Sequence, residues 1–172
     1  SNDFYIAGDS GAGYLNPRSL KLRPDSGLPS GLQAWAEHCS RYYRRWDLDI
    51  TGFILDGSGG SSTETEFAAY RQFSRAGAGT HFEPGPVMHN GIPTCPERDL
   101  PDDANQAAAI IADLANKAEG TGFLWARSIL KSPKWYAQVS QRLAEKHPEA
   151  KVEVVDPYTF FGLIRQHLAG VK

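Results

Sequence analysis

The chain has 172 residues, and its 18 Lys and Arg residues against 20 Asp and Glu residues give a formal net charge of -2. This length suits one good hydrophobic core and is short for two, because typical domains hold roughly 100 to 200 residues. We therefore expect a single domain over residues 1–172. The near-neutral charge leaves no positive field to hold a phosphate backbone, so no nucleic-acid partner is expected. No apolar run approaches the roughly 20 residues that cross a bilayer, so no membrane span is expected either.

The start of the chain and its cysteines add two expectations. A strand-like run, Phe4-Tyr5-Ile6-Ala7, comes almost at once, which favours a segment cut from a longer protein. Two cysteines, Cys39 and Cys95, are too few for a disulfide scaffold and are interpreted as separate thiols.

Apolar and β-branched runs recur along the chain, and each is followed by apolar residues spaced by three and four, which is the pattern of repeated βα units. The predicted strands are residues 4–8, 50–56, 80–83, 122–127 and 152–156. The predicted helices are residues 32–46, 64–75, 103–118, 134–147 and 158–169. We expect an α/β fold of five βα units around a mostly parallel sheet, either partly barrel-like in the manner of a TIM barrel or open and doubly wound.

Right-handed crossovers bring the carboxyl ends of all parallel strands to one edge of the sheet. The predicted loops at that edge are residues 9–29, 57–63 and 84–101. The first and third exceed the roughly 12 residues beyond which a loop in a compact domain usually binds or covers something. Any active or binding site is therefore expected at this edge.

Charged residues stand at, or one residue beyond, the carboxyl end of each predicted strand. They are Asp9, Asp56, Glu83, Arg127 and Asp156. Ligands bind at this edge in open α/β sheets and in barrels alike, so the group favours a binding or active site. The alternative is that the three aspartates cap turns or the following helices, as acidic residues at βα junctions often do.

Three chemistries use clustered carboxylates, and the spacing alone leaves all three open. Glycoside hydrolysis uses two, separated by about 5 to 9.5 Å. Metal-dependent phosphoryl transfer uses two or more as ligands of a divalent ion. Recognition of sugar hydroxyls uses them as hydrogen-bond partners and breaks no bond.

The first loop is the most distinctive stretch, and it reads Gly8-Asp9-Ser10-Gly11-Ala12-Gly13-Tyr14-Leu15-Asn16-Pro17. Glycines remove side chains where the backbone turns sharply or approaches a ligand. Its first half is only weakly similar to a phosphate-binding loop, because Pro17 and Pro24 break any helix that would follow. The remaining readings are a rigid loop that presents Tyr14 to a ligand and a purely structural turn.

This loop resembles the signature of the GxGYxYP putative glycoside hydrolases, in particular their C-terminal domain. The match holds at Gly11, Gly13, Tyr14 and Pro17 and departs at Asn16, where the family pattern has tyrosine. The resemblance, which we extend over most of the chain, implies a barrel-like βα domain of a bacterial, exported, carbohydrate-related protein. It also implies that another domain of the full-length protein completes the cleft. It carries no settled catalytic pair onto this chain.

Two further considerations concern histidines and cofactors. His89, in the third loop, is a candidate to donate to a substrate or to transfer protons near neutral pH, and is otherwise a surface histidine. The five histidines show no pair at metal-ligand spacing, so no metal site is expected, and no cofactor is implied.

The leading hypothesis is a carbohydrate-active domain that hydrolyses glycosides and binds a carbohydrate ligand. Glu83 is the predicted proton donor, because a carboxyl beside Phe82 and a proline-rich loop is partly desolvated, and desolvation favours the protonated acid. Asp56 is the predicted nucleophile or base. The residues expected to contact or orient the ligand are Asp9, Tyr14, His89, Arg127 and Asp156. The alternatives are a noncatalytic carbohydrate-binding or interaction domain and a metal-dependent phosphotransferase.

Overall fold

The computed structural model describes residues 3–9, 11, 13–21, 24–55, 60–127 and 130–170. The chain divides into two compact units, which are described separately: unit 1 is Ser1–Pro96 with Val155–Lys172, and unit 2 is Glu97–Val154. The expectation of a single domain stays a prediction. None of the helices in the described ranges combines the length and the apolar character needed to cross a membrane.

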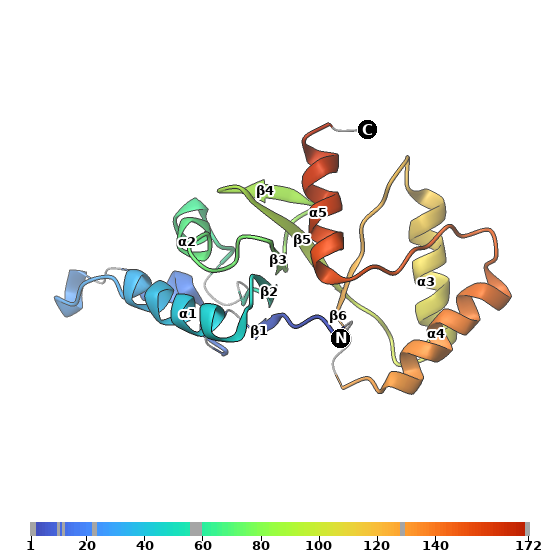
Figure 1. Cartoon of the computed structure of the whole chain (residues 1–172), viewed down its shortest axis with the longest axis horizontal. Helices are drawn as coiled ribbons and strands as arrows, with labels where there is room; N and C mark the ends of the chain where they lie inside the picture. Colours follow the sequence, from blue (N-terminus) through green and yellow to red (C-terminus); the bar gives the residue numbers. More distant parts are fainter. Residues whose placement is uncertain are drawn as a thin grey trace. The chain divides into compact units, whose positions relative to one another are not determined.

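Unit 1 is built on a sheet whose strands are β1 (Ala7–Asp9), β2 (Ile50–Phe53), β3 (Gly77–Thr80), β4 (Val87–His89) and β5 (Ile92–Asp99), of which β5 continues into unit 2. Their spatial order is β1-β2-β3-β5-β4 (Figure 1). The pairs β1–β2, β2–β3 and β3–β5 are parallel, and the pair β4–β5 is antiparallel. The sheet is curled in the manner of half a barrel, and the prediction of an α/β fold with a mostly parallel sheet is confirmed.

One face of this sheet is covered by α1 (Leu32–Trp46) and α2 (Glu64–Tyr70). Two short 3-10 helices, η1 (Pro17–Leu20) and η2 (Pro24–Ser26), lie in the first loop. The buried rings between these helices and the sheet are those of Trp35, Tyr43, Phe67, Tyr70 and Phe73. Trp35 meets Tyr70 and Phe73 edge to face, with centroids 5.0 and 5.3 Å apart. Such contacts stabilise a core beyond the area that they bury.

The other face of the sheet holds α5 (Pro157–Leu168). Side chains alternate between faces along a strand, so Gly77 faces away from its buried neighbour Ala78. The Phe161 ring of α5 fills the space above Gly77, where a Cβ atom would lie 2.1 Å from Phe161 Cγ. Arg165 then donates to the carbonyl oxygens of Gly91 and Arg75 at 2.9 and 3.0 Å, which holds α5 along β3 and the hairpin.

Unit 2 consists of the end of β5, β6 (Trp125–Arg127), α3 (Ala104–Lys117) and α4 (Pro133–Lys146). β6 is parallel to β5, with Glu97 opposite Trp125 and Asp99 opposite Arg127. Its core is formed by Leu100, Ala107, Ala108, Trp135 and Val139. Asp103 and Ser132 cap the two helices through their side-chain oxygens, as expected for these residue types.

Two strand predictions are wrong. The third strand spans residues 77–80 and not 80–83, because the buried Gly-Ala-Gly-Thr run lacks the large β-branched residues that mark a strand in sequence. Residues 152–156 form no strand, and Val154 is 87 % exposed, so this apolar run has no sheet to bury it.

The third predicted loop, residues 84–101, contains β4 and β5, which sequence analysis missed. A two-residue turn joins them: Asn90 and Gly91 both have positive φ, 48° and 75°. An Asn-Gly pair of this kind is the preferred connection of a tight hairpin. The prolines at positions 93 and 96 lie inside β5 and hide it, because proline has no N–H for a β ladder.

Substituting Gly77→Ala should lower the free energy of unfolding by about 3 kcal/mol, because the new methyl group overlaps Phe161 in a closely packed site. Gly162→Ala is the matched control, since nothing lies within 4 Å of a Cβ there and alanine favours helix by up to about 1 kcal/mol. Urea denaturation of both variants measures the difference. Equal stabilities would show that α5 does not pack on β3 in this way.

Candidate functional site

A hydrogen-bonded polar cluster in unit 1 joins Glu64, His89 and Glu83. His89 Nδ1 lies 2.5 Å from Glu64 Oε1, and His89 Nε2 lies 2.5 Å from Glu83 Oε1. The ring of Phe67 stacks on the His89 ring with centroids 4.1 Å apart and planes inclined by 4°. The imidazole is therefore held by a partner at each nitrogen and by an aromatic face.

Glu83 is held in place by residues of two strands. Its Oε2 atom accepts from the hydroxyls of Thr80 and Thr94 at 2.8 and 2.7 Å, and both threonines are fully buried. The Glu83 side chain is 17 % exposed. Every carboxyl oxygen thus has a hydrogen-bond partner while part of the group stays accessible.

The cluster links three titratable groups in one hydrogen-bonded chain. Each imidazole nitrogen either donates or accepts, so the direction of each contact depends on which nitrogens of His89 carry a proton. Glu64, whose side chain is 65 % exposed, is the open end of the chain.

The hairpin turn explains why His89 reaches Glu83. β4 runs opposite to β3, so its last residue lies away from the carboxyl end of β3, and the His89 side chain spans the distance back. The turn residue Asn90 also donates to the carboxylate and to the carbonyl oxygen of Glu64, at 2.7 and 2.9 Å. These bonds orient Glu64 toward the imidazole.

Sequence analysis selected two members of this cluster separately and missed the third. Glu83 and His89 were singled out for different roles, and the structure places them in direct contact. Glu64 opens α2 and was interpreted only as part of that helix. The Asn-Gly pair was the signal that could have led to it, because a tight turn there returns the chain toward α2.

Other predicted site residues of unit 1 lie at the carboxyl ends of β1 and β2. Asp9 ends β1, is half-buried and stands opposite Phe53, the last residue of β2. Tyr14 is 77 % exposed in the first loop, and its role as a ligand contact stays a prediction. Asp56 lies outside the described residues.

The signature residues of the first loop have structural partners. Gly11 has a φ of 78°, and a Cβ there would lie 3.2 Å from both Phe73 and the Tyr43 hydroxyl, so this glycine allows the loop to approach the core. Asn16 is buried and caps η1 by accepting from the Arg18 amide at 2.9 Å. Asn16 therefore has a structural role at the position where the family pattern has tyrosine.

Asp156 is the N-cap of α5. Its Oδ1 atom accepts from the amides of Tyr158 and Thr159 at 2.9 and 3.0 Å, and Oδ2 accepts from the Thr159 hydroxyl at 2.6 Å. The hydroxyl bond and then the Thr159 amide bond hold the pKa of Asp156 below its usual value. Capping is thus an observed role of Asp156, and its role as a ligand contact stays a prediction.

Arg127 belongs to unit 2, where it pairs with two acids of β5. Its guanidinium donates to both carboxylate oxygens of Asp99, at 2.6 and 2.8 Å, and lies 3.2 Å from Glu97 Oε1. Planar two-point pairing of this kind fixes the guanidinium and uses much of its donor capacity. The contact of Arg127 with a ligand stays a prediction.

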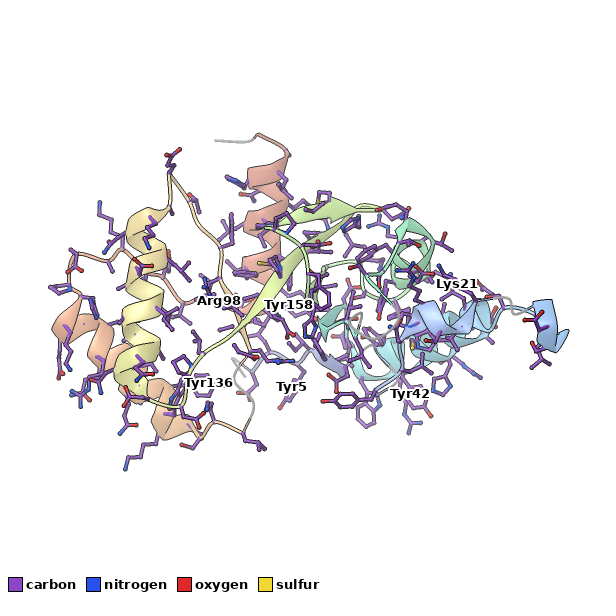
Figure 2. The ribbon with its side chains drawn as sticks, turned by 180° about the vertical axis from the view of Figure 1, so that it is seen from behind. Tyr5, Lys21, Tyr42, Arg98, Tyr136 and Tyr158 are labelled. Carbon is purple, nitrogen blue, oxygen red and sulfur yellow. The ribbon has the colours of Figure 1, made fainter. Side chains whose placement is uncertain are left out.

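Cationic side chains from the first loop bind the segment that leads into α2. Arg18 donates to the carbonyl oxygen of Ser61 at 2.7 Å, over Gly60, where a Cβ would lie 2.4 Å from the guanidinium. Lys21, labelled in Figure 2, lies 3.4 Å from the fully buried carboxylate of Glu66. These contacts fix the first loop against the start of α2.

Metal and cavity analysis gives two further findings. Within the described part of the chain, no three His, Cys, Asp or Glu side chains are placed to hold one metal ion. One surface hollow is lined by Glu37, Ser40, Arg41 and Arg44 of α1 and by Gln72, and a second is lined by residues of α1 and α2 and of the segments beside them. Neither is lined by Glu64, His89 or Glu83. Cys39 and Cys95 are buried as two separate thiols.

Glu66 should make the stability of unit 1 depend on acid pH. Burial raises its pKa, but the hydrogen bonds from Thr63 and the charge of Lys21 outweigh burial and hold the pKa below the usual 4.5. A lowered pKa in the folded state stabilises the protein above pH 4.5, and this contribution is lost as pH falls through the folded value. Urea denaturation at a series of pH values should therefore show the stability advantage over Glu66→Gln shrinking below that point. A difference in the free energy of unfolding between the two proteins that stays constant with pH would contradict this role of Glu66.

Comparison with known proteins gives one family match. No curated protein and no solved structure matches the chain. The match spans β1, α1, β2, α2 and β3 and ends at Glu83, so it includes Asp9 and Tyr14 but not His89. Residues 1–83 match the GxGYxYP putative glycoside hydrolase C-terminal domain, which confirms the resemblance that the first loop predicts.

Proposed function

We propose that this chain is a carbohydrate-active domain that hydrolyses glycosidic bonds, with Glu83 as the proton donor. The observation that supports this most is the hydrogen-bonded chain Glu64–His89–Glu83. It gives a partly buried carboxyl a neighbour with which to exchange a proton, and it ends at an exposed carboxylate. The matched family, the GxGYxYP putative glycoside hydrolase C-terminal domain, is consistent with this activity.

In this proposal Glu83 protonates the leaving oxygen of the glycosidic bond and recovers its proton from His89 Nε2. His89 is then neutral, with its remaining proton on Nδ1 facing Glu64, and it regains a proton at Nε2 from solvent after the product leaves. Thr80 and Thr94 keep the Glu83 carboxyl in one orientation during both steps. Holding a catalytic group in a fixed orientation is one of the largest contributions to catalysis.

The second carboxylate in the proposal is Asp56, acting as nucleophile or base. It follows β2 in sequence, and β2 is the neighbour of β3. We propose four ligand contacts: Asp9 at the end of β1, Tyr14 in the first loop, Arg127 and Asp156. We also propose that another domain of the full-length protein completes the cleft, and that the protein is bacterial and exported.

The second candidate is a noncatalytic carbohydrate-binding or interaction domain. The observations that favour it are that Asp156 caps a helix and that Arg127 is paired with Asp99 and Glu97. Side chains engaged in this way have structural roles that need no chemistry. Binding of a sugar without turnover in a chain that contains an intact Glu83 would support this candidate.

Glu83→Gln should lower turnover of an unactivated oligosaccharide by about 100-fold or more, the usual range for loss of general acid catalysis. Hydrolysis of a dinitrophenyl glycoside should fall much less, because that leaving group departs without a proton. Turnover of both substrates in a panel of oligosaccharides and aryl glycosides measures the contrast. Unchanged turnover of the oligosaccharide would rule out Glu83 as the acid.

Glu64→Gln should lower turnover by less than about 100-fold, the cost of misplacing a catalytic group by 1 Å, and should change the pH profile. Glutamine keeps an acceptor for His89 but removes the negative charge. Glu37→Gln is the control, because Glu37 is an exposed acid on α1 that bonds only to Gln33 among the side chains of that helix. A pH profile identical to that of the unsubstituted chain would show that Glu64 takes no part in proton exchange.

A further inference from the structure

Three rings form a column at the carboxyl ends of β2 and β3, separate from the buried aromatic core. Phe53 and His81 have centroids 4.6 Å apart, and His81 and Phe82 have centroids 5.4 Å apart. Phe82 is 62 % exposed, and the other two rings are half-buried. The column thus starts inside the protein and ends in solvent.

The residues of the column are neighbours of two predicted site acids, one across the sheet and one along the chain. Phe53 stands opposite Asp9 in the pairing of β1 with β2, and residues paired in this way have their side chains on the same face of a sheet. Phe82 comes directly before Glu83, which the two threonines hold in place. One end of the column thus lies at the strand position paired with Asp9, and the other end is adjacent in sequence to Glu83.

We propose that Phe53, His81 and Phe82 form a platform for one sugar ring beside Glu83; this rests on the proposed function and names the substrate class. A pyranose ring has a face of C–H groups and a rim of hydroxyls. The C–H face packs on the exposed Phe82 ring, which removes apolar area from water, and the hydroxyls donate to the carboxylates. An apolar surface with a few polar groups around it is the usual composition of a ligand site.

Charge narrows the class of sugar further. Asp9 is paired across the sheet with Phe53, Glu83 follows Phe82, and His89 links Glu83 to a third acid, Glu64. A negatively charged sugar would be repelled there, while a neutral or amino sugar would not. The platform therefore selects neutral and amino sugars over uronic acids.

The test is calorimetric titration of the whole chain with cellohexaose, xylohexaose, chitosan hexamer and hexagalacturonate. One or more of the first three should bind, and hexagalacturonate should bind more weakly than they do. Phe82→Ala should weaken the binding by about tenfold, the cost of losing a buried aromatic contact. Tyr136→Ala, which removes a half-exposed ring of unit 2 (Figure 2), should leave it unchanged.

The outcomes separate this proposal from the proposed catalysis. If Phe82→Ala weakens sugar binding while Glu83→Gln leaves turnover intact, the platform is supported and the role of Glu83 as proton donor is ruled out. If Phe82→Ala leaves sugar binding intact while Glu83→Gln removes turnover, the platform is ruled out and the role of Glu83 as proton donor is supported. Failure of all four oligosaccharides to bind, or preference for hexagalacturonate, would overturn the platform.

Discussion

Parallel pairing of β1, β2 and β3 is the constraint on which the candidate site depends. It brings the ends of three chain segments that are distant in sequence to one edge of the sheet, where Asp9 lies opposite Phe53 and Glu83 follows β3. Parallel strands require crossovers, so the loops at this edge are long and carry groups that the core does not need. The arrangement leaves Asp9 at the end of β1 and Glu83 beyond the end of β3.

Much of the fold could be predicted from the sequence because each helix has a local signal, the spacing of its apolar residues by three and four. The spacing of apolar residues predicted both ends of α1 correctly and the ends of α3, α4 and α5 to within a few residues. The exception is α2, which ends at Tyr70 and not at residue 75 as expected. Strands were harder to predict, since β3 is glycine-rich and β5 contains two prolines. Burial by neighbours outweighed the weak local preference in both strands.

The candidate site was predictable in its residue types and not in its contacts. Glu83 and His89 were recognisable as titratable groups, but their pairing depends on a hairpin that folds β4 back on β5. Glu64 looks like any other acid at the start of a helix. Conversely, Gly11 and Asn16 belong to the signature loop, and the structure gives them partners in the core and in η1. The sequence shows the chemical type of each side chain, and the tertiary structure determines which other side chains it contacts.

The contact between α5 and β3 affects how the protein is made. Unit 1 is discontinuous, since Phe161 and Arg165 come after the whole of unit 2 in the chain yet pack on Gly77 and the hairpin. A ribosome that has just released β3 has therefore not yet made the helix that covers one face of the sheet. Long-range pairing of this kind slows folding, and an uncovered apolar sheet is exposed to aggregation in the interval. The nascent chain must keep that face protected until synthesis reaches α5.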